Sequence, residues 1–316
     1  MKKLSILIPH YNSSLELERL LNSIPNNNLI EIIIVDDHSS QKHVTKLNEL
    51  NKNNGNQEIK ILFNESGRKS AGAARNKALE FATGDWILFA DSDDYFLSGF
   101  YEIVNKYFYS DNDIVFFIPT SIYNDTKELA QRHFEYKELI RNFIIQEDEI
   151  SESRLRYDFT VPWSKLYRAS FIKEHSITFD EVMYSNDVMF STKSGFYADK
   201  IETSTDVIYC VTRDKGSLTS TLNEQIFDIR LEVSLRKFIF LKENLSKEGF
   251  KKLGMSGRPA LIRARQFGIS KVIKVYKILR VHRIKIVSFK IFNPIWIINR
   301  YKKIRRKEKD LKRYLN

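Results

Sequence analysis

Residues 30–37 read Ile-Glu-Ile-Ile-Ile-Val-Asp-Asp, and this stretch gives the clearest indication of the fold class. The run of β-branched side chains from 30 to 35 is nearly continuous, which is typical of a strand buried on both faces of a parallel sheet. Ligands of such sheets bind beyond the carboxyl ends of the strands. The two carboxylates that end the run, Asp36 and Asp37, are therefore candidate site residues.

Strand and helix patterns alternate on both sides of this run. Further strands are predicted at residues 4–8, 59–63, 86–90 and 114–118. Helical spacing is found at residues 15–24, 41–53, 71–82 and 98–109. Strands that alternate with helices of this length form βαβ units, so we predict an α/β fold with a mostly parallel central sheet flanked by helices.

The pattern changes after this alternating part of the chain. Residues 120–215 are less regular, and residues 222–316 are mostly helical. We therefore predict three parts: residues 1–120 and 121–220 form the two parts of one α/β domain, and residues 221–316 form a helical C-terminal extension.

Composition excludes several classes of protein. Of the 316 residues 42% are hydrophobic and 29% are charged, which is a normal globular composition and excludes wholesale disorder. The single cysteine, Cys210, excludes an intrachain disulfide and a cysteine-based zinc site, and it favours a reducing compartment. We found no run of 18 apolar residues, so no transmembrane helix is predicted.

Charge is concentrated at the end of the chain. Residues 271–316 carry 16 Lys and Arg against two acids, a net of +14, while the other 270 residues carry 35 bases and 38 acids, a net of −3. Isoleucines and aromatic residues alternate with the bases, as in helices that lie in a membrane interface. We expect residues 269–316 to bind an anionic membrane surface. A helix packed on the body and a nucleic-acid contact are the alternatives.

Asp91-Ser92-Asp93-Asp94 follows the strand predicted at residues 86–90. Three carboxylates this close repel one another unless a cation joins them. Mg²⁺ or Mn²⁺ with oxygen ligands is the natural partner, and such ions complete their shells with substrate phosphates. An acidic turn or helix cap is the alternative.

Other polar residues are candidates for binding. The carboxylate of Asp37 can accept a hydrogen bond from a nucleobase ring N–H, although helix capping near Ser40 is the alternative. Arg75, in the small-residue stretch 71–76, can pair with phosphate or with an acid. His10 and His38 are expected to orient backbone rather than to bind metal.

Two features of the middle part remain open on the residues alone. Trp163 beside Lys165 is either an aromatic platform next to a cation, suited to a phosphorylated sugar, or part of the core. Asp187 precedes an apolar run, and it is either a functional acid or a simple helix cap.

These stretches together resemble the family 2 glycosyltransferases, which have the GT-A fold. Their order and spacing match over residues 3–100, and the second half resembles the bacterial capsule and lipopolysaccharide members more loosely. The stretches are Ser5–Asn12, Ile34–Ser39, Gly72–Asn76, Gly84–Ile87, Ala90–Asp94, Val161–Tyr167, Phe179–Asp180 and Asp187.

The resemblance implies an inverting, metal-dependent transfer from a nucleotide-diphosphate sugar, most often a UDP-sugar. Asp187 would be the general base. Asp91 and Asp93 would bind Mn²⁺ or Mg²⁺, and Trp163, Lys165 and Asn186 would contact the acceptor. The nucleotide would be bound by Pro9, Tyr11, Asn12, Asp36, Asp37, Arg75, Asp91, Ser92 and Arg213.

The expected partners are the donor and a saccharide acceptor, with the acceptor attached to a lipid and the enzyme at the inner face of the plasma membrane. No nucleic acid is expected. Asn186 stands where many relatives carry Glu, which puts the acceptor contact or the pKa of Asp187 in doubt, and His38 replaces a usual Gly. A non-catalytic binding protein of the same fold is an alternative. A sugar nucleotidyltransferase is another, although the loop after the first strand lacks the required Gly-rich sequence.

Overall fold

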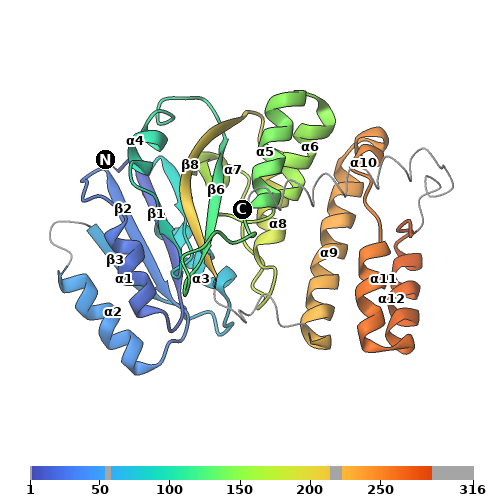
Figure 1. Cartoon of the computed structure of the whole chain (residues 1–316), viewed down its shortest axis with the longest axis horizontal. Helices are drawn as coiled ribbons and strands as arrows, with labels where there is room; N and C mark the ends of the chain where they lie inside the picture. The colour runs from blue at the N-terminus through green and yellow to red at the C-terminus, as the bar shows by residue number, and fades with distance from the viewer. Residues whose placement is uncertain (1, 54–57, 214–222, 287–316) are drawn as a thin grey trace. The chain divides into compact units, whose positions relative to one another are not determined.

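The computed structural model describes residues 2–53, 58–213 and 223–286. The chain divides into two compact units (Figure 1). The first consists of Met1–Leu222 and Glu232–Lys237, and the second of Asn223–Leu231 and Phe238–Asn316. The predicted boundary between residues 120 and 121 falls inside the first unit and stays a prediction.

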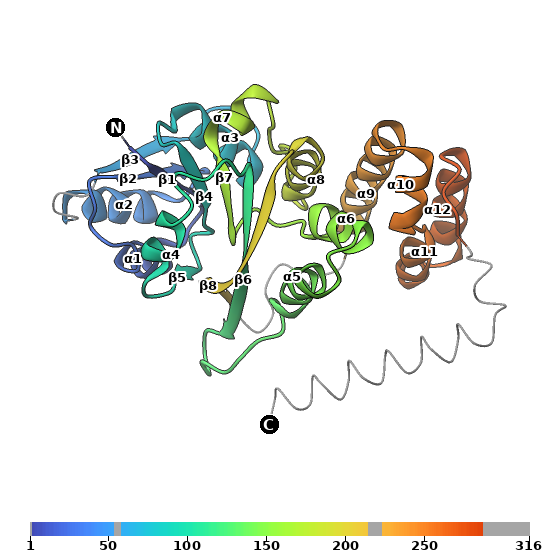
Figure 2. The same ribbon diagram turned by 90° about the horizontal axis from the view of Figure 1, so that it is seen from above.

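An eight-stranded sheet with the order β3-β2-β1-β4-β7-β6-β8-β5 forms the centre of the first unit. The strands are β1 (Leu4–His10), β2 (Ile30–Asp36), β3 (Glu58–Phe63), β4 (Trp86–Phe89), β5 (Tyr95–Phe96), β6 (Ile114–Tyr123), β7 (Lys165–Arg168) and β8 (Ile201–Arg213). Strands β3, β2, β1 and β4 are parallel, and β6 and β8 run parallel side by side (Figure 2). Strand β7 is antiparallel to both of its neighbours, and β5 is antiparallel to β8.

Among the described residues of the first unit before position 214, eight helices accompany the sheet. They are α1 (Ser14–Asn22), α2 (Gln41–Asn53), α3 (Ala71–Phe81), α4 (Phe100–Asn105), α5 (Phe134–Gln146), α6 (Glu149–Asp158), α7 (Ala169–Glu174) and α8 (Asp187–Tyr197). Helix α3 packs on β1 and β2, whereas α5 packs on β6 and β8.

The strand predicted at residues 30–35 is confirmed, and every residue of β1, β2 and β4 is buried. Full burial explains why these strands show no alternation of polar and apolar residues. Leu7, Ile33 and Leu88 have no exposed surface. Each such side chain stabilises the fold by about 1.5–3 kcal/mol relative to its exposed state.

The predicted α/β alternation is confirmed, and two elements differ in detail. The helix predicted at residues 98–109 is shorter and spans Phe100–Asn105. The N–H of Leu97 bonds to the carbonyl of Ile208, so the segment before the helix stays in the sheet as β5. After Asn105 the backbone continues in turns, in which the N–H of Tyr107 bonds to the carbonyl of Val104. The strand predicted at 114–118 continues to Tyr123, because β8 pairs with it along its whole length.

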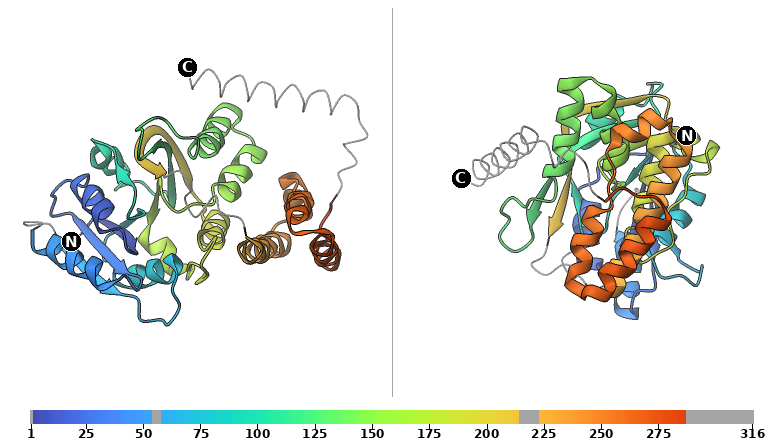
Figure 3. Two further views of the ribbon diagram at one scale, coloured as in Figure 1. Left: turned by 60° about the horizontal axis from the view of Figure 1, so that its bottom comes forward. Right: turned by 90° about the vertical axis from the view of Figure 1, so that its right-hand side faces the viewer.

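The second unit is helical in its described residues. Its elements are α9 (Glu224–Asn244), which also contributes Glu232–Lys237 to the first unit, α10 (Lys247–Leu253), α11 (Arg258–Ala264), a 3₁₀ turn (Arg265–Phe267) and α12 (Ile269–Val281). Helices α11 and α12 lie side by side (Figures 1 and 3). No helix among the described residues is long and apolar enough to cross a membrane. The predicted surface of residues 269–316 lies outside the described residues from position 287 onward.

Candidate active site

The ends of β1 and β2 are held together by a buried histidine–aspartate pair. His10 Nδ1 lies 2.9 Å from Asp36 Oδ1, and the N–H of Ser39 donates to Asp36 Oδ2. Burial by itself would raise the pKa of Asp36, but the hydrogen bonds from His10 and Ser39 outweigh it, and the pKa is lowered. Both oxygens of Asp36 thus bind groups of the protein, and the residue positions the loop. The contact predicted between Asp36 and the nucleotide stays a prediction.

Asp37, the next residue, uses its carboxylate differently. The side chain is buried, and Oδ1 accepts a hydrogen bond from the Asn64 amide at 2.7 Å. His38 Nδ1 lies 3.4 Å from the same oxygen. Among the described residues, none donates to Oδ2. Asp37 therefore has one carboxylate oxygen available to a ligand and one that fixes its orientation.

The loop after β1 is tied to the loop after β2. The N–H of Asn12 donates to the Ser39 hydroxyl, and Asn12 Oδ1 accepts from the N–H of Ser40. These bonds stabilise the left-handed backbone of Asn12, whose φ is 50°. Pro9 is buried within β1, whereas the Tyr11 ring is 47% exposed with Lys69 Nζ 3.5 Å from its centroid. Of the predicted nucleotide contacts in this loop, only Tyr11 and Asn12 have exposed side chains.

The four residues of the acidic loop, defined here as residues 91–94, have different surroundings. Asp94 is buried and accepts hydrogen bonds from the Tyr209 hydroxyl and from the N–H of Thr212. Burial, and then the charges of Asp93 and Asp91, raise the pKa of Asp94 well above its usual range. Asp94 therefore anchors the loop to β8. Asp93 is exposed, and the hydroxyl of Ser92 is bonded to that of Ser13.

Asp91 is fixed from two sides. Its N–H donates to the Tyr209 hydroxyl at 2.8 Å, and Arg75 Nη2 lies 2.5 Å from Asp91 Oδ1. About a third of the Asp91 side chain is exposed (32%). The loop thus offers carboxylate oxygens from Asp91 and Asp93 at one edge of the sheet.

This donor set fits a hard divalent cation. Mg²⁺ is bound by one or two carboxylates together with substrate phosphates, so two aspartates suffice. Among the described residues, no group of three or more His, Cys, Asp and Glu side chains is arranged to hold a metal by itself. Asp91 and Asp93 therefore fit a cation that is completed by phosphate oxygens, and they do not form a closed structural site.

Arg75 connects the acidic loop to the start of α8. This side chain is only 5% exposed, and Nη1 donates to Asn186 Oδ1 at 2.8 Å while Nη2 binds Asp91. The close packing of α3 allows this bridge: a Cβ on Gly72 would lie 2.1 Å from the Asp180 carbonyl oxygen. The structure therefore brings the predicted residues Arg75, Asp91 and Asn186 together.

Asp187, the first residue of α8, follows Asn186 and is partly exposed. Loss of contact with solvent raises the pKa of Asp187. The positive charge of Arg75 opposes this rise, and the negative charge of Asp91 adds to it. A raised pKa makes this carboxylate a stronger base than an ordinary aspartate, as proton abstraction requires. The structure places Asp187 next to the Arg75–Asn186 contact.

Trp163 and Lys165 are core residues, which revises the prediction that they contact the acceptor. Trp163 is 3% exposed and stacks on Tyr209 at 5.9 Å between ring centroids. Lys165 is 1% exposed, and its Nζ donates to the Phe159 carbonyl at 2.7 Å. Burial lowers the pKa of Lys165 well below its usual range. Strands and helices from other parts of the chain cover both side chains, and the stretch Val161–Tyr167 alone does not reveal this cover.

Arg213 is the last described residue of β8, and its carbonyl accepts a hydrogen bond from the N–H of Asn124. The residues that follow it, from 214 to 222, lie outside the described part of the chain. The contact predicted between Arg213 and the nucleotide stays a prediction.

Comparison with known proteins identifies the family. The family model described as "Glycosyl transferase family 2" matches residues 5–176, which is more than half of the chain.

This chain belongs to glycosyl transferase family 2.

Curated relatives of this glycosyltransferase are found in Bacillus. EpsH of Bacillus subtilis is 27% identical over 258 residues, which cover 78% of this chain and 72% of EpsH. The poly(ribitol-phosphate) β-glucosyltransferase of Bacillus spizizenii is 30% identical over 231 residues, covering 67% of this chain. The match spans only 33% of that longer relative.

Among solved structures, S. aureus TarS 1–349 in complex with UDP-GlcNAc is similar with a TM-score of 0.61. The identity is 23%, and the match covers 84% of this chain and 73% of the TarS chain. This likeness establishes the fold, a mixed α/β GT-A architecture with a mostly parallel central sheet and a helical C-terminal region.

Three residues that position the site of this glycosyltransferase were not predicted from the sequence. Asn64, Tyr209 and Thr212 lie outside the motifs, yet they bind Asp37 and the acidic loop. Asn64 follows β3 directly, so the rule that ligands gather at strand ends was the signal that could have found it. Tyr209 and Thr212 are 115 and 118 residues from Asp94, and only the pairing of β8 in the sheet reveals them.

Proposed function

We propose that this glycosyltransferase moves a sugar from a nucleotide-diphosphate sugar, with UDP as the preferred nucleotide, to a saccharide hydroxyl, with inversion at the anomeric carbon. The observation that carries the proposal is the Arg75 bridge, because it joins the acidic loop to the start of α8. A donor held by the acidic loop and a hydroxyl activated by Asp187 would then meet at one edge of the sheet.

The nucleotide preference rests on Asp37. Its available Oδ2 would accept the ring N–H that uracil, thymine and guanine have and that cytosine lacks. Tyr11 and Asn12 have exposed side chains in the adjoining loop and would complete this part of the donor site. The TarS structure is of a complex with UDP-GlcNAc, which favours UDP among these nucleotides.

The chemistry would be a single displacement. Asp187 would take the proton from the acceptor hydroxyl, the oxygen would form a bond to the anomeric carbon, and the bond to the diphosphate would break. With the base on the face opposite the leaving group, the configuration would invert. When bound by Asp91 and Asp93, Mn²⁺ or Mg²⁺ would neutralise the charge of the departing diphosphate. Arg75 would keep Asp91 and the start of α8 in place.

The acceptor is proposed to be a lipid-linked saccharide of a bacterial surface polysaccharide, with the enzyme peripheral at the inner face of the plasma membrane. The strongly basic C-terminal part supports this location. The named substrate of the Bacillus spizizenii relative, poly(ribitol-phosphate), supports a surface polymer as the product.

Release of UDP from UDP-glucose, UDP-GlcNAc and UDP-galactose, and of GDP from GDP-mannose, tests the proposal with a panel of p-nitrophenyl glycosides as acceptors. Acceptor-dependent turnover should fall about a hundredfold to ten-thousandfold in Asp187→Asn. Asp199→Asn is the control, because Asp199 is an exposed acid beyond the same helix. No turnover by the wild type with any pair, despite nucleotide binding, would favour a non-catalytic binding protein.

A further inference from the structure

Helices α11 and α12 of the second unit expose large apolar side chains. On α12, Ile269 is 75% exposed, Ile273 49% and Tyr276 47%. These three residues are spaced i, i+4 and i+7, so they form a stripe along one side of the helix. On α11, Ile262 is 53% exposed. The exposed apolar side chains therefore lie on two helices that pack side by side.

The opposite side of α12 is already occupied. Lys271, Val275 and Leu279 are buried and spaced i, i+4 and i+8. Lys271 Nζ binds Glu224 at 2.8 Å and Asp228 at 2.6 Å, both on α9. The side of α12 that carries Lys271 thus packs in the core of the unit, whereas the isoleucine stripe remains exposed.

Every charge on the exposed sides of these two helices is positive. The sequence has no acid between Glu248 and Glu308. The exposed bases of α11 and α12 are Arg258, Arg263, Lys274, Lys277 and Arg280. The acids that neutralise Lys271 belong to α9, so no carboxylate within α11 or α12 balances these five bases.

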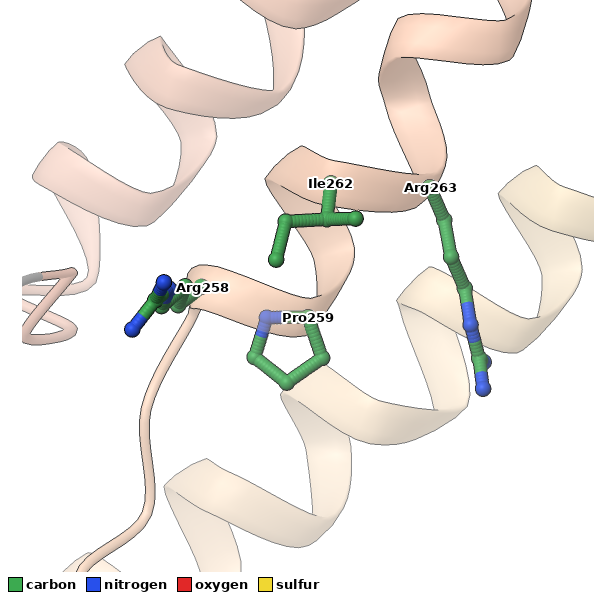
Figure 4. Close-up of a pocket in the computed structure, with 4 residues that line it drawn as sticks. All are labelled: Arg258, Pro259, Ile262 and Arg263. Carbon is green, nitrogen blue, oxygen red and sulfur yellow. The ribbon is translucent and has the colours of Figure 1, made fainter. Parts of the chain in front are cut away.

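A shallow pocket of about 360 Å³ on α11 shows the same combination. Arg258 and Arg263 extend on either side of Pro259 and Ile262 (Figure 4). Two guanidinium groups that flank an apolar floor suit a phosphate whose attached chain is apolar.

We infer that the exposed sides of α11 and α12, defined here as the α11–α12 face by Arg258, Ile262, Ile269, Ile273, Lys277 and Arg280, dock on an anionic lipid bilayer. The apolar side chains enter the boundary between headgroups and acyl chains, and the bases remain at the level of the phosphates. The inference deepens the proposed function, since a bilayer is where a lipid-linked acceptor resides.

Charge complementarity favours an anionic bilayer as the partner of the α11–α12 face. A second copy would bring one basic face against another, and the like charges would repel. Residues 287–316 carry ten bases and two acids, so they have the same sign as the face. An anionic leaflet has the opposite charge and an apolar interior, and it therefore matches both properties of the α11–α12 face.

Sedimentation of the full-length protein with vesicles tests the inference, using phosphatidylcholine alone or with about 30% phosphatidylglycerol. The charge variant is Arg258→Glu/Lys277→Glu/Arg280→Glu, and its control is Lys42→Glu/Arg154→Glu/Lys173→Glu. Both variants change three exposed bases and have the same net charge. The apolar variant Ile269→Ser/Ile273→Ser keeps the charge. Thermal melts and UDP binding of each variant are measured in parallel.

We expect the wild type to bind the anionic vesicles and not phosphatidylcholine alone. The charge variant should lose at least about a hundredfold in partitioning, because each base near an anionic leaflet contributes about a fivefold factor. The control should change by less than tenfold, and the apolar variant should lose at least tenfold. All variants should keep the UDP binding of the wild type, so a failure of the donor site would be recognised separately.

Three results would overturn the inference. The wild type could fail to bind anionic vesicles. The charge variant could bind as the wild type does, or lose no more than its control, which would assign the binding to another part of the chain. Binding could also be insensitive to Ile269→Ser/Ile273→Ser and be displaced by duplex DNA, which would make the face a nucleic-acid surface.

Discussion

Asp36 and Asp37 are adjacent carboxylates at one strand end, and their hydrogen-bond partners give them different roles. The sequence predicts that this pair lies at the ligand edge of the sheet, but it does not distinguish the two residues. The difference arises because His10 and Ser39 occupy both oxygens of Asp36, whereas Asn64 occupies one oxygen of Asp37.

Substitution of each aspartate by alanine separates the two roles. Asp37→Ala should weaken UDP binding about tenfold to hundredfold, because it removes a hydrogen bond to a charged acceptor. Its melting temperature should change little. Asp36→Ala should lower the free energy of unfolding by about 2–3 kcal/mol, because the buried His10 loses its partner. Calorimetric titration with UDP and urea unfolding measure the two effects, and an equal loss of UDP affinity without destabilisation in Asp36→Ala would refute the division.

The pH dependence of transfer reports on Asp187. A general base works in its deprotonated form, so the rate should fall as the pH falls through the pKa of this residue. Because that pKa is raised, the midpoint of the acid limb should lie above 3.8, the ordinary value for Asp. The measurement is kcat/KM against pH, with circular dichroism to verify folding at each point. An acid limb at or below 3.8 in folded protein would contradict the role of Asp187 as the base.

At the scale of secondary-structure elements, the alternating first part of the fold is predictable because it depends on local patterns. Runs such as residues 30–35 and the stop signals between them lie within short windows of sequence. The second half depends on distant pairing: Arg75 binds Asn186 across 111 residues, and β7 enters the sheet between β4 and β6. No local pattern encodes such contacts, so the Arg75–Asn186 bridge could not be predicted.

The close approach of α3 to the segment before α8 can be tested at Gly72. Gly72→Ala places a methyl group 2.1 Å from the Asp180 carbonyl oxygen, so the backbone must shift. We expect a loss of about 1–3 kcal/mol in the free energy of unfolding. Transfer should fall at least about tenfold, because displaced groups misalign the reactants.

Gly249→Ala in α10 is the matched control, since its new methyl group meets only the Ser246 hydroxyl, at 3.2 Å. Urea unfolding and the UDP-release assay should show little change for this variant. Wild-type activity and stability in Gly72→Ala would show that the packing of α3 does not position the site.

Strand β7 carries the residue whose surroundings differ most from the sequence-based prediction. Lys165 lies against Phe116, Phe159 and Tyr167, with Nζ 4.8–5.8 Å from the ring centroids. The sequence leaves open whether Trp163 and Lys165 belong to a binding surface or to the core, because the same residue types suit both.

Lys165→Met tests the core assignment through the pH dependence of stability. The folded-state pKa of Lys165 is depressed, so the unfolded state binds its proton more tightly, and the wild type gains stability as the pH rises toward 10.5. The variant should lack this gain, whereas Lys173→Met, at an exposed lysine, should keep it. Urea unfolding at pH 7 and pH 9.5 measures the difference. If the stability of Lys165→Met depended on pH as that of the wild type does, and transfer were lost, Lys165 would instead be assigned to the acceptor site.

At the scale of the whole molecule, the two units of the chain expose different kinds of side chain. The first unit carries the candidate site, where Arg75 and Asp91 form an internal ion pair. The second unit exposes bases and isoleucines on α11 and α12. The concentration of positive charge in the C-terminal part is predictable from the sequence, because the charged residues can simply be counted. The assignment of the basic, apolar side chains to particular exposed helix sides requires the folded structure.

In the proposed function, the first unit binds uridine diphosphate through a divalent cation at Asp91 and Asp93. The most direct test is the thermal shift of the full-length protein with UDP and Mn²⁺, with UDP and EDTA, and with Mn²⁺ alone. The variant is Asp93→Ala, and Glu102→Ala, at an exposed acid of α4, is the control. UDP at 100 times its Kd adds about 2.7 kcal/mol, which raises the melting temperature by several degrees.

We predict that this shift requires both UDP and Mn²⁺ in the wild type and in Glu102→Ala, and that it disappears in EDTA and in Asp93→Ala. The same UDP-induced shift in EDTA, or in Asp93→Ala with Mn²⁺, would contradict the claim that a cation at the acidic loop holds the donor.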